Sequence, residues 1–132
     1  MIELVWDAER TGTAVAASGA STRVGDEATF SPGDMMAMGA SSCLMRTFLD
    51  LAARAHVRVM SYASTAELES PPSGPPLLSV HAYLVASSDA DRIRLLELFA
   101  DAQRQSSVCR LLDHRLSCTV DIQMIPAARP AP

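Results

Sequence analysis

The chain has 132 residues, a formal net charge of −4 and 20% charged residues, which are the values of one ordinary globular domain. Apolar residues make up 48% of the chain but aromatic residues only 5%, so Leu, Val, Met and Ala must fill the core. The acidic balance argues against a nucleic-acid-binding surface. The uncharged run Met35–Met45 is too short to cross a bilayer, and Glu3, Asp7 and Glu9 argue against a secretory signal, so we expect a cytoplasmic protein.

Short strands are predicted before the first helix. Ile2–Trp6 and Thr11–Ala17 contain β-branched and aromatic residues, and Arg10–Gly12 between them is typical of a hairpin turn. Small polar residues over Gly19–Asp26 predict a loop, which leads to a short third strand at Ala28–Phe30.

A long helix is predicted from Pro32 to about His56. Ser31 can cap this helix, proline is favoured at its first position, and Asp34 complements the positive end of the helix dipole. The first turns, Met35–Met45, are apolar or small on every side. This pattern predicts a helix that is surrounded by protein on all sides.

In the second half of the chain, apolar and polar residues alternate with a period of two on both sides of a Pro-rich connection. The alternation predicts two long antiparallel strands at Val57–Glu69 and Leu77–Ser87. Ser88 then caps a second helix. The predicted buried stripe of this helix consists of Ile93, Leu96, Phe99 and Ala100.

The pattern leaves open whether the second helix continues through Ser106 to Leu112 or kinks first. Apolar and polar residues alternate clearly over Leu116–Met124, which predicts a last strand. The order of elements indicates an α+β fold, with helices packed on a mostly antiparallel sheet. We expect a single domain over residues 1–125 and a disordered Pro/Ala tail over residues 126–132.

Three cysteines, Cys43, Cys109 and Cys118, are the candidates for chemistry. In a cytoplasmic chain they are expected to be free, catalytic or redox-active rather than a disulfide framework. Cys43 lies among small residues and is either an inert buried residue or a reactive thiol that needs a cation nearby. Cys109, followed by Arg110, is equally open to both interpretations. Cys118 belongs to the apolar face of a strand and is predicted to be structural.

No metal ion or other cofactor is expected. The histidines at positions 56, 81 and 114 lie far from one another in sequence, and neither they nor the cysteines have the spacing of a zinc site.

The segment from Ser31-Pro32 to Met38-Gly39-Ala40-Ser41-Ser42-Cys43 resembles the OsmC/Ohr superfamily (osmotically inducible protein C and organic hydroperoxide resistance protein). In that family a buried helix begins with Pro-Glu and carries a reactive cysteine eleven residues after the proline, which is the spacing from Pro32 to Cys43. The resemblance extends over nearly the whole chain: the opening strands, the helix, the long hairpin, the second helix and the final strand.

The resemblance implies antiparallel sheets around a long buried central helix, in an intertwined homodimer with active sites at the subunit interface. It also implies thiol-dependent reduction of organic hydroperoxides in oxidative stress defence. In that scheme Cys43 attacks the O–O bond, becomes a sulfenic acid and condenses with a second cysteine to a disulfide, which an external thiol or dithiol reduces. Arg10, in its Arg-x-Gly context, matches the arginine that stabilises the thiolate in the family, with Arg23 as the reserve.

Two positions depart from the family pattern. Gly33 replaces the glutamate that helps to hold the arginine, and Ser106 stands where the family has its second cysteine. Cys109 lies three residues further on, about 5–6 Å if the segment is helical. Cys109 is therefore either within reach of Cys43 or beyond the Cα separation of about 7 Å that a disulfide allows.

Two functions follow from this comparison. The chain is either a hydroperoxide reductase that uses Cys43, with Cys109 or an external thiol as its second thiol, or a non-catalytic member. The non-catalytic member would keep the dimeric fold and act as a binding or structural protein.

Overall fold

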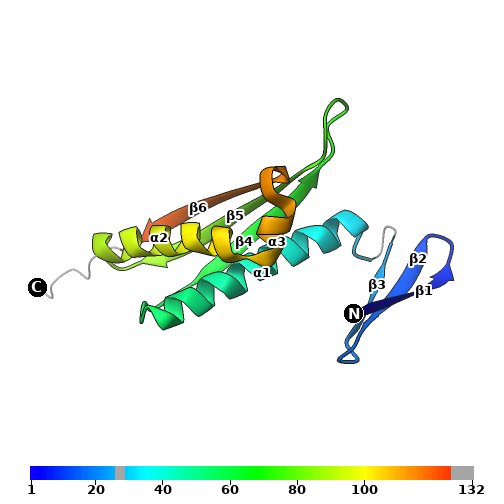
Figure 1. The fold of residues 1–132 in the computed structure, drawn as a ribbon, viewed down its shortest axis with the longest axis horizontal. Coiled ribbons are helices and arrows are strands. Elements are labelled where there is room, and N and C mark those ends of the chain that lie inside the picture. Colours follow the sequence, from blue (N-terminus) through cyan, green and yellow to red (C-terminus); the bar gives the residue numbers. More distant parts are fainter. Residues whose placement is uncertain (26–28, 126–132) are drawn as a thin grey trace, which may run out of the picture. The chain divides into compact units, whose positions relative to one another are not determined.

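The computed structural model describes residues 1–25 and 29–125, and the chain folds into two compact units, residues 1–36 and 37–132 (Figure 1). The first unit contains a three-stranded antiparallel sheet in the order β1-β2-β3. Its strands are β1 (Ile2–Ala8), β2 (Thr11–Ala16) and β3 (Ser21–Val24). The two predicted strands of the first hairpin are therefore confirmed.

Strand β3 corrects the prediction for Gly19–Asp26, which is not entirely a loop. Ser21–Val24 pairs with the edge of β2 that β1 leaves free, and backbone hydrogen bonds hold it there although the segment has only one apolar side chain, Val24. The predicted strand at Ala28–Phe30 lies partly outside the described residues. Of its described part, Phe30 forms an isolated bridge with Val24.

Helix α1 (Pro32–Arg54) starts as predicted. The Ser31 hydroxyl accepts a hydrogen bond from the Asp34 backbone N–H at 3.0 Å, and the Asp34 carboxylate accepts one from the Ser31 N–H at 3.2 Å. The helix ends two residues before the predicted His56, which has a φ of 56°. There the Val57 N–H turns back and donates to the Ala52 carbonyl oxygen at 2.9 Å.

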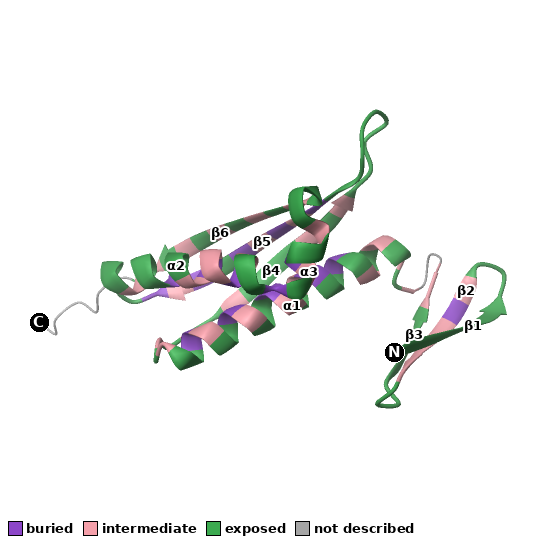
Figure 2. Cartoon of the chain, viewed as in Figure 1, coloured by how far each residue is buried: buried purple, intermediate pink, exposed green. Residues whose placement is uncertain are grey.

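Burial along α1 is confined to one face, as Figure 2 shows for the single chain. The predicted enclosure on all sides is therefore not found within one chain. The buried stripe consists of Ala37, Ala40, Leu44, Phe48 and Ala52. Apolar side chains of a second stripe are exposed to solvent in the single chain: Met38 is 40% exposed, Met45 37% and Leu49 38%. These three side chains have the spacing of one helix face.

The second unit contains a sheet in the order β4-β5-β6, formed by β4 (Tyr62–Glu69), β5 (Leu77–Ala86) and β6 (Leu116–Met124). The antiparallel pairing of β4 with β5 confirms the prediction. Strand β4 begins at Tyr62 instead of Val57, because the first residues after α1 end that helix. Strands β5 and β6 are parallel, as the helical crossover between them requires, so the sheet is mixed.

The crossover contains α2 (Asp89–Gln105), α3 (Ser107–Leu112) and a 3-10 turn, η1 (Asp113–Arg115). Ser88 caps α2 as predicted, because its hydroxyl accepts a hydrogen bond from the Asp91 N–H at 3.1 Å. The second helix does not continue through Ser106, because a break at this residue separates α2 from α3.

The buried stripe of α2 differs from the prediction. Phe99 is buried as expected, but its companions are Leu95 and Ala102. Ile93 is 52% exposed and Leu96 38% exposed, so the prediction is wrong for both. Both sets have helical spacing, and only the packing of the helix on the sheet selects one of them.

One core joins both long helices to the same face of the sheet (Figure 1). Alternate residues of β5 line this core: Leu78, Val80, Ala82, Leu84 and Ala86. The Phe48 ring from α1 lies 5.6 Å from the Tyr62 ring and 6.2 Å from the Phe99 ring of α2, measured between centroids. The result is a mixed α+β fold. No helix in the described part of the chain is long and apolar enough to span a membrane.

Candidate functional site

Cys43 lies on α1, half-buried, and faces the junction between α2 and α3. The Ser106 hydroxyl donates a hydrogen bond to the Cys43 Sγ at 3.1 Å. The Ser107 Oγ lies 3.7 Å from the same sulfur. Residues more than sixty positions apart in sequence therefore meet at this thiol.

The break between the two helices explains why Ser106 points at Cys43. The Ser106 N–H ends α2 by donating to the Ala102 carbonyl oxygen at 2.8 Å, and its ψ of 123° turns the chain out of the helix. Its Oγ then accepts a hydrogen bond from the Cys109 N–H at 3.4 Å and caps α3. With Ser106 only 1% exposed, both hydrogen-bonding functions of this buried hydroxyl are used.

Several hydrogen bonds favour the thiolate of Cys43. Burial is the largest influence and alone would raise the pKa. Hydrogen bonds from the Ser106 hydroxyl, the Val108 backbone N–H and the Ser107 hydroxyl act in the opposite direction, and the pKa lies below its ordinary value. A partly accessible cysteine with a lowered pKa is a nucleophile, whereas a sealed one is inert.

Cys109, the predicted second thiol, is paired with Cys118 of β6. The hydrogen bond from Cys118 lowers the pKa of Cys109 against the opposing effect of burial. The same contact, together with burial, raises the pKa of Cys118. All three cysteines carry free thiols. The structure thus places a hydroxyl beside Cys43 and a thiol beside Cys109.

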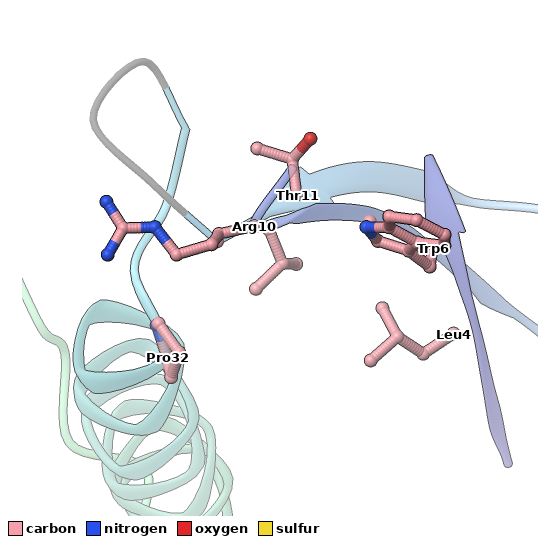
Figure 3. A pocket seen from close by; sticks show the side chains of 8 residues that line it. Leu4, Trp6, Arg10, Thr11 and Pro32 are labelled. Atoms are coloured by element: carbon pink, nitrogen blue, oxygen red, sulfur yellow. The ribbon is translucent and has the colours of Figure 1, made fainter. Parts of the chain in front are cut away.

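Arg10 belongs to the first unit and Cys43 to the second, and a direct role for Arg10 stays a prediction. Arg10 lines a pocket of about 430 Å³, and Figure 3 shows its side chain pointing away from Trp6. The lining also includes Leu4, Trp6, Thr11, Gly12, Val24, Gly25 and Pro32. The reserve candidate, Arg23, is engaged with the Asp7 carboxylate at 3.9 Å and the Thr11 hydroxyl at 3.5 Å.

Gly25 permits the chain to pass close to Arg10. It has a φ of +139°, and a Cβ at this position would lie 2.1 Å from the Arg10 carbonyl oxygen. A side chain here would therefore displace the backbone of Arg10.

Sequence reasoning missed Ser107 and the pairing of Cys118 with Cys109. It recognised Ser106 only as a replacement for a family cysteine. The two consecutive serines before a short apolar segment are a helix-cap signal that could have placed the break at Ser106.

The fold is shared with solved structures of low sequence identity. One is an OsmC-like protein of unknown function from Vibrio cholerae O1 biovar eltor, with a TM-score of 0.75, 16% identity, and coverage of 92% of this chain and 97% of that chain. An OsmC-like protein from Mycoplasma pneumoniae has a TM-score of 0.78, 11% identity, and coverage of 96% of each chain. An organic hydroperoxide resistance protein from Legionella pneumophila has a TM-score of 0.69, 13% identity, and coverage of 93% of this chain and 96% of that chain.

No curated protein sequence matches this chain. The sequence model of the family described as OsmC-like protein does match, over residues 25–121. This range contains the whole of α1 and the Ser106–Ser107 junction. The chain therefore belongs to the OsmC-like protein family.

Proposed function

We propose that this chain is a thiol-dependent reductase of organic hydroperoxides, with Cys43 as the reacting thiol. The observation that carries the proposal is the half-buried Cys43 sulfur, which accepts a hydrogen bond from Ser106 at 3.1 Å and has a lowered pKa. The thiolate bonds to one oxygen of the hydroperoxide, the O–O bond breaks, and the other oxygen takes a proton and leaves in the alcohol. The sulfur becomes a sulfenic acid, oxidised by two electrons.

The second half of the reaction depends on an external thiol. Ser106 occupies the place beside Cys43, and a hydroxyl cannot supply the sulfur of a disulfide. An external thiol would attack the sulfenic acid, forming a mixed disulfide and releasing water. A second thiol would then release Cys43 and leave as the external disulfide. A reducing compartment such as the cytoplasm supplies these thiols.

We further propose that the active form is a homodimer, with Arg10 as a cation for the thiolate. Support for the dimer comes from exposed apolar side chains. The exposed stripe of α1, formed by Met38, Met45 and Leu49, is one such region. Trp6 of β1 is 73% exposed. Large apolar side chains are more frequent in the core of protein interfaces than on the rest of the surface.

Cumene hydroperoxide tests the peroxidase proposal. In a variant that carries Cys109→Ser and Cys118→Ser, Cys43 is the remaining thiol. We expect this variant to consume one equivalent of hydroperoxide, release cumyl alcohol and form a sulfenic acid that dimedone traps. Adding Cys43→Ser should abolish all three signals.

The controls separate enzyme from binding protein. Equal hydroperoxide consumption with and without Cys43 would overturn the assignment of the reacting thiol. A Cys43 pKa near the ordinary value of about 8.5, together with no consumption, would favour the non-catalytic alternative.

A further inference from the structure

Cys109 and Cys118 form a pair that the proposed chemistry of Cys43 does not use. Cys109 is 6% exposed on α3, and Cys118 is half-buried on β6. Each thiol is the largest single influence on the pKa of the other, which is lowered at Cys109 and raised at Cys118. Both line a pocket of about 280 Å³, whose other lining residues are Gln103, Arg104, Arg110, Asp113 and Leu116.

The backbone holds both members of this pair in place. The Cys109 N–H donates to the Ser106 hydroxyl at 3.4 Å, and the Cys118 carbonyl oxygen accepts a hydrogen bond from the Gln103 side chain at 3.3 Å. Cys118 also lies in register with Val80 of the central strand β5. The closeness of the two sulfurs is therefore a property of the crossover from α2 to β6.

An unpaired hydroxyl lies near the same two thiols. The Tyr62 Oη is buried and has no hydrogen-bond partner among the described residues. Burial, followed by electrostatic interaction with Cys118 and Cys109, raises the pKa of Tyr62 to about 12. A protonated hydroxyl that both cysteines influence is a suitable neighbour for a sulfur that becomes negatively charged.

We propose that Cys109 and Cys118 form a second redox site, a dithiol that closes to a disulfide by exchange with a small organic disulfide. The Cys109 thiolate attacks one sulfur of the organic disulfide, bonds to it, and expels the other half as a thiolate. Cys118 gives its proton to that thiolate and attacks the Cys109 sulfur, which expels the remaining half; this second thiolate takes a proton from water. The protein loses two electrons and the organic disulfide gains them, which yields two small thiols.

The order of attack follows from the pairing. The hydrogen bond from Cys118 favours the thiolate form of Cys109, so Cys109 is the first nucleophile. Cys118 keeps its proton until the mixed disulfide on Cys109 has formed.

Oxidised and reduced glutathione in graded ratios, applied to Cys43→Ser, test the proposal without any contribution from Cys43. After alkylation, trypsin places Cys109 in the peptide 105–110 and Cys118 in the peptide 116–132, because trypsin does not cleave the bond between Arg129 and Pro130. We expect a cross-linked pair of these peptides and an intact mass lower by two hydrogen atoms. Adding Cys118→Ser should stop the reaction at glutathione bound to Cys109, whereas adding Cys109→Ser should leave Cys118 unmodified.

The cross-link itself decides the outcome. If no link between the peptides 105–110 and 116–132 forms in the most oxidising buffer, the second redox site does not exist. Glutathione trapped on Cys118 instead of Cys109 would overturn the order of attack. If a variant fails to fold, the unmodified chain gives the same readout, because Cys43 lies in a third tryptic peptide, 24–46. Since Cys43→Ser has no peroxidase thiol, the result is independent of the function proposed above.

Discussion

Replacing Ser106 by alanine removes the hydrogen bond on which the reactivity of Cys43 depends. The Ser106 hydroxyl donates to Cys43 at 3.1 Å and is itself 1% exposed. A hydrogen bond to a charged group contributes about 1.5–3 kcal/mol in a buried setting. Sulfur is a weak acceptor and Cys43 is only half-buried, so we take a smaller value of about 1.4 kcal/mol, and losing this stabilisation of the thiolate raises the pKa of Cys43.

The same substitution removes the cap of α3, because the Ser106 hydroxyl also accepts from the Cys109 N–H. We expect a loss of about 1 kcal/mol in the free energy of unfolding from this cause. Ser88→Ala is the matched control, since Ser88 caps α2 with a similar hydrogen bond at 3.1 Å. It should lower stability to a similar extent and leave the pKa of Cys43 unchanged.

Rates of alkylation against pH, read from the tryptic peptide 24–46, measure the pKa of Cys43 separately from those of the other two thiols. A lowered folded-state pKa stabilises the fold at pH values above the unfolded pKa, and this contribution is lost as the pH falls through the folded pKa. The stability difference between wild type and Ser106→Ala should therefore be larger at alkaline than at neutral pH. An unchanged Cys43 pKa in Ser106→Ala would refute the reasoning.

Three further outcomes are expected. In the Cys109→Ser background, Ser106→Cys should form a disulfide between Cys43 and the introduced cysteine after one equivalent of hydroperoxide. The disulfide would be seen as a link between peptides 24–46 and 105–110, and two free thiols would contradict the placement of this side chain. Tyr62→Phe should raise the free energy of unfolding in urea by about 1 kcal/mol, because it removes an unpaired buried hydroxyl, whereas the exposed Tyr83→Phe should not. Because the folded pKa of Tyr62, about 12, lies above its unfolded value, wild type should also lose stability as the pH rises from 10 to 12, and Tyr62→Phe should lose less. Leu49→Glu should shift the molar mass from light scattering towards the monomer, and an unchanged dimer mass would remove the α1 stripe from the proposed interface.

The elements that could be predicted from sequence are those whose own side chains determine them. Leu116–Met124 alternates over its full length, and the start of α1 has its cap and its proline in the local sequence. Strand β3 could not be predicted, because its pairing depends on the free edge of β2. The prediction of Ile93 and Leu96 as buried residues of α2 is wrong for a similar reason, because the helix has two apolar faces and only its packing on the sheet selects between them.

Some residues of the candidate site could likewise be predicted from the sequence, and others could not. The spacing from Pro32 to Cys43 identified the thiol on α1, and the family pattern drew attention to position 106. The pairing of Cys109 with Cys118 could not be predicted, because it depends on where β6 returns to pair in parallel with β5. A strand residue on an apolar face has no local signal that distinguishes a structural thiol from a paired one.

The serine at the end of α2 also has a kinetic consequence. An internal sulfur would meet an oxidised Cys43 at an effective concentration set by the fold, whatever the surroundings contain. With a hydroxyl in that place, recovery would require a collision with a molecule from solution, and its rate would rise in proportion to the amount of that molecule. The turnover rate would then depend on the concentration of small thiols in the cell. A fall in that concentration would slow the first reduction of oxidised Cys43 here before it slowed the same step in a relative with two adjacent cysteines.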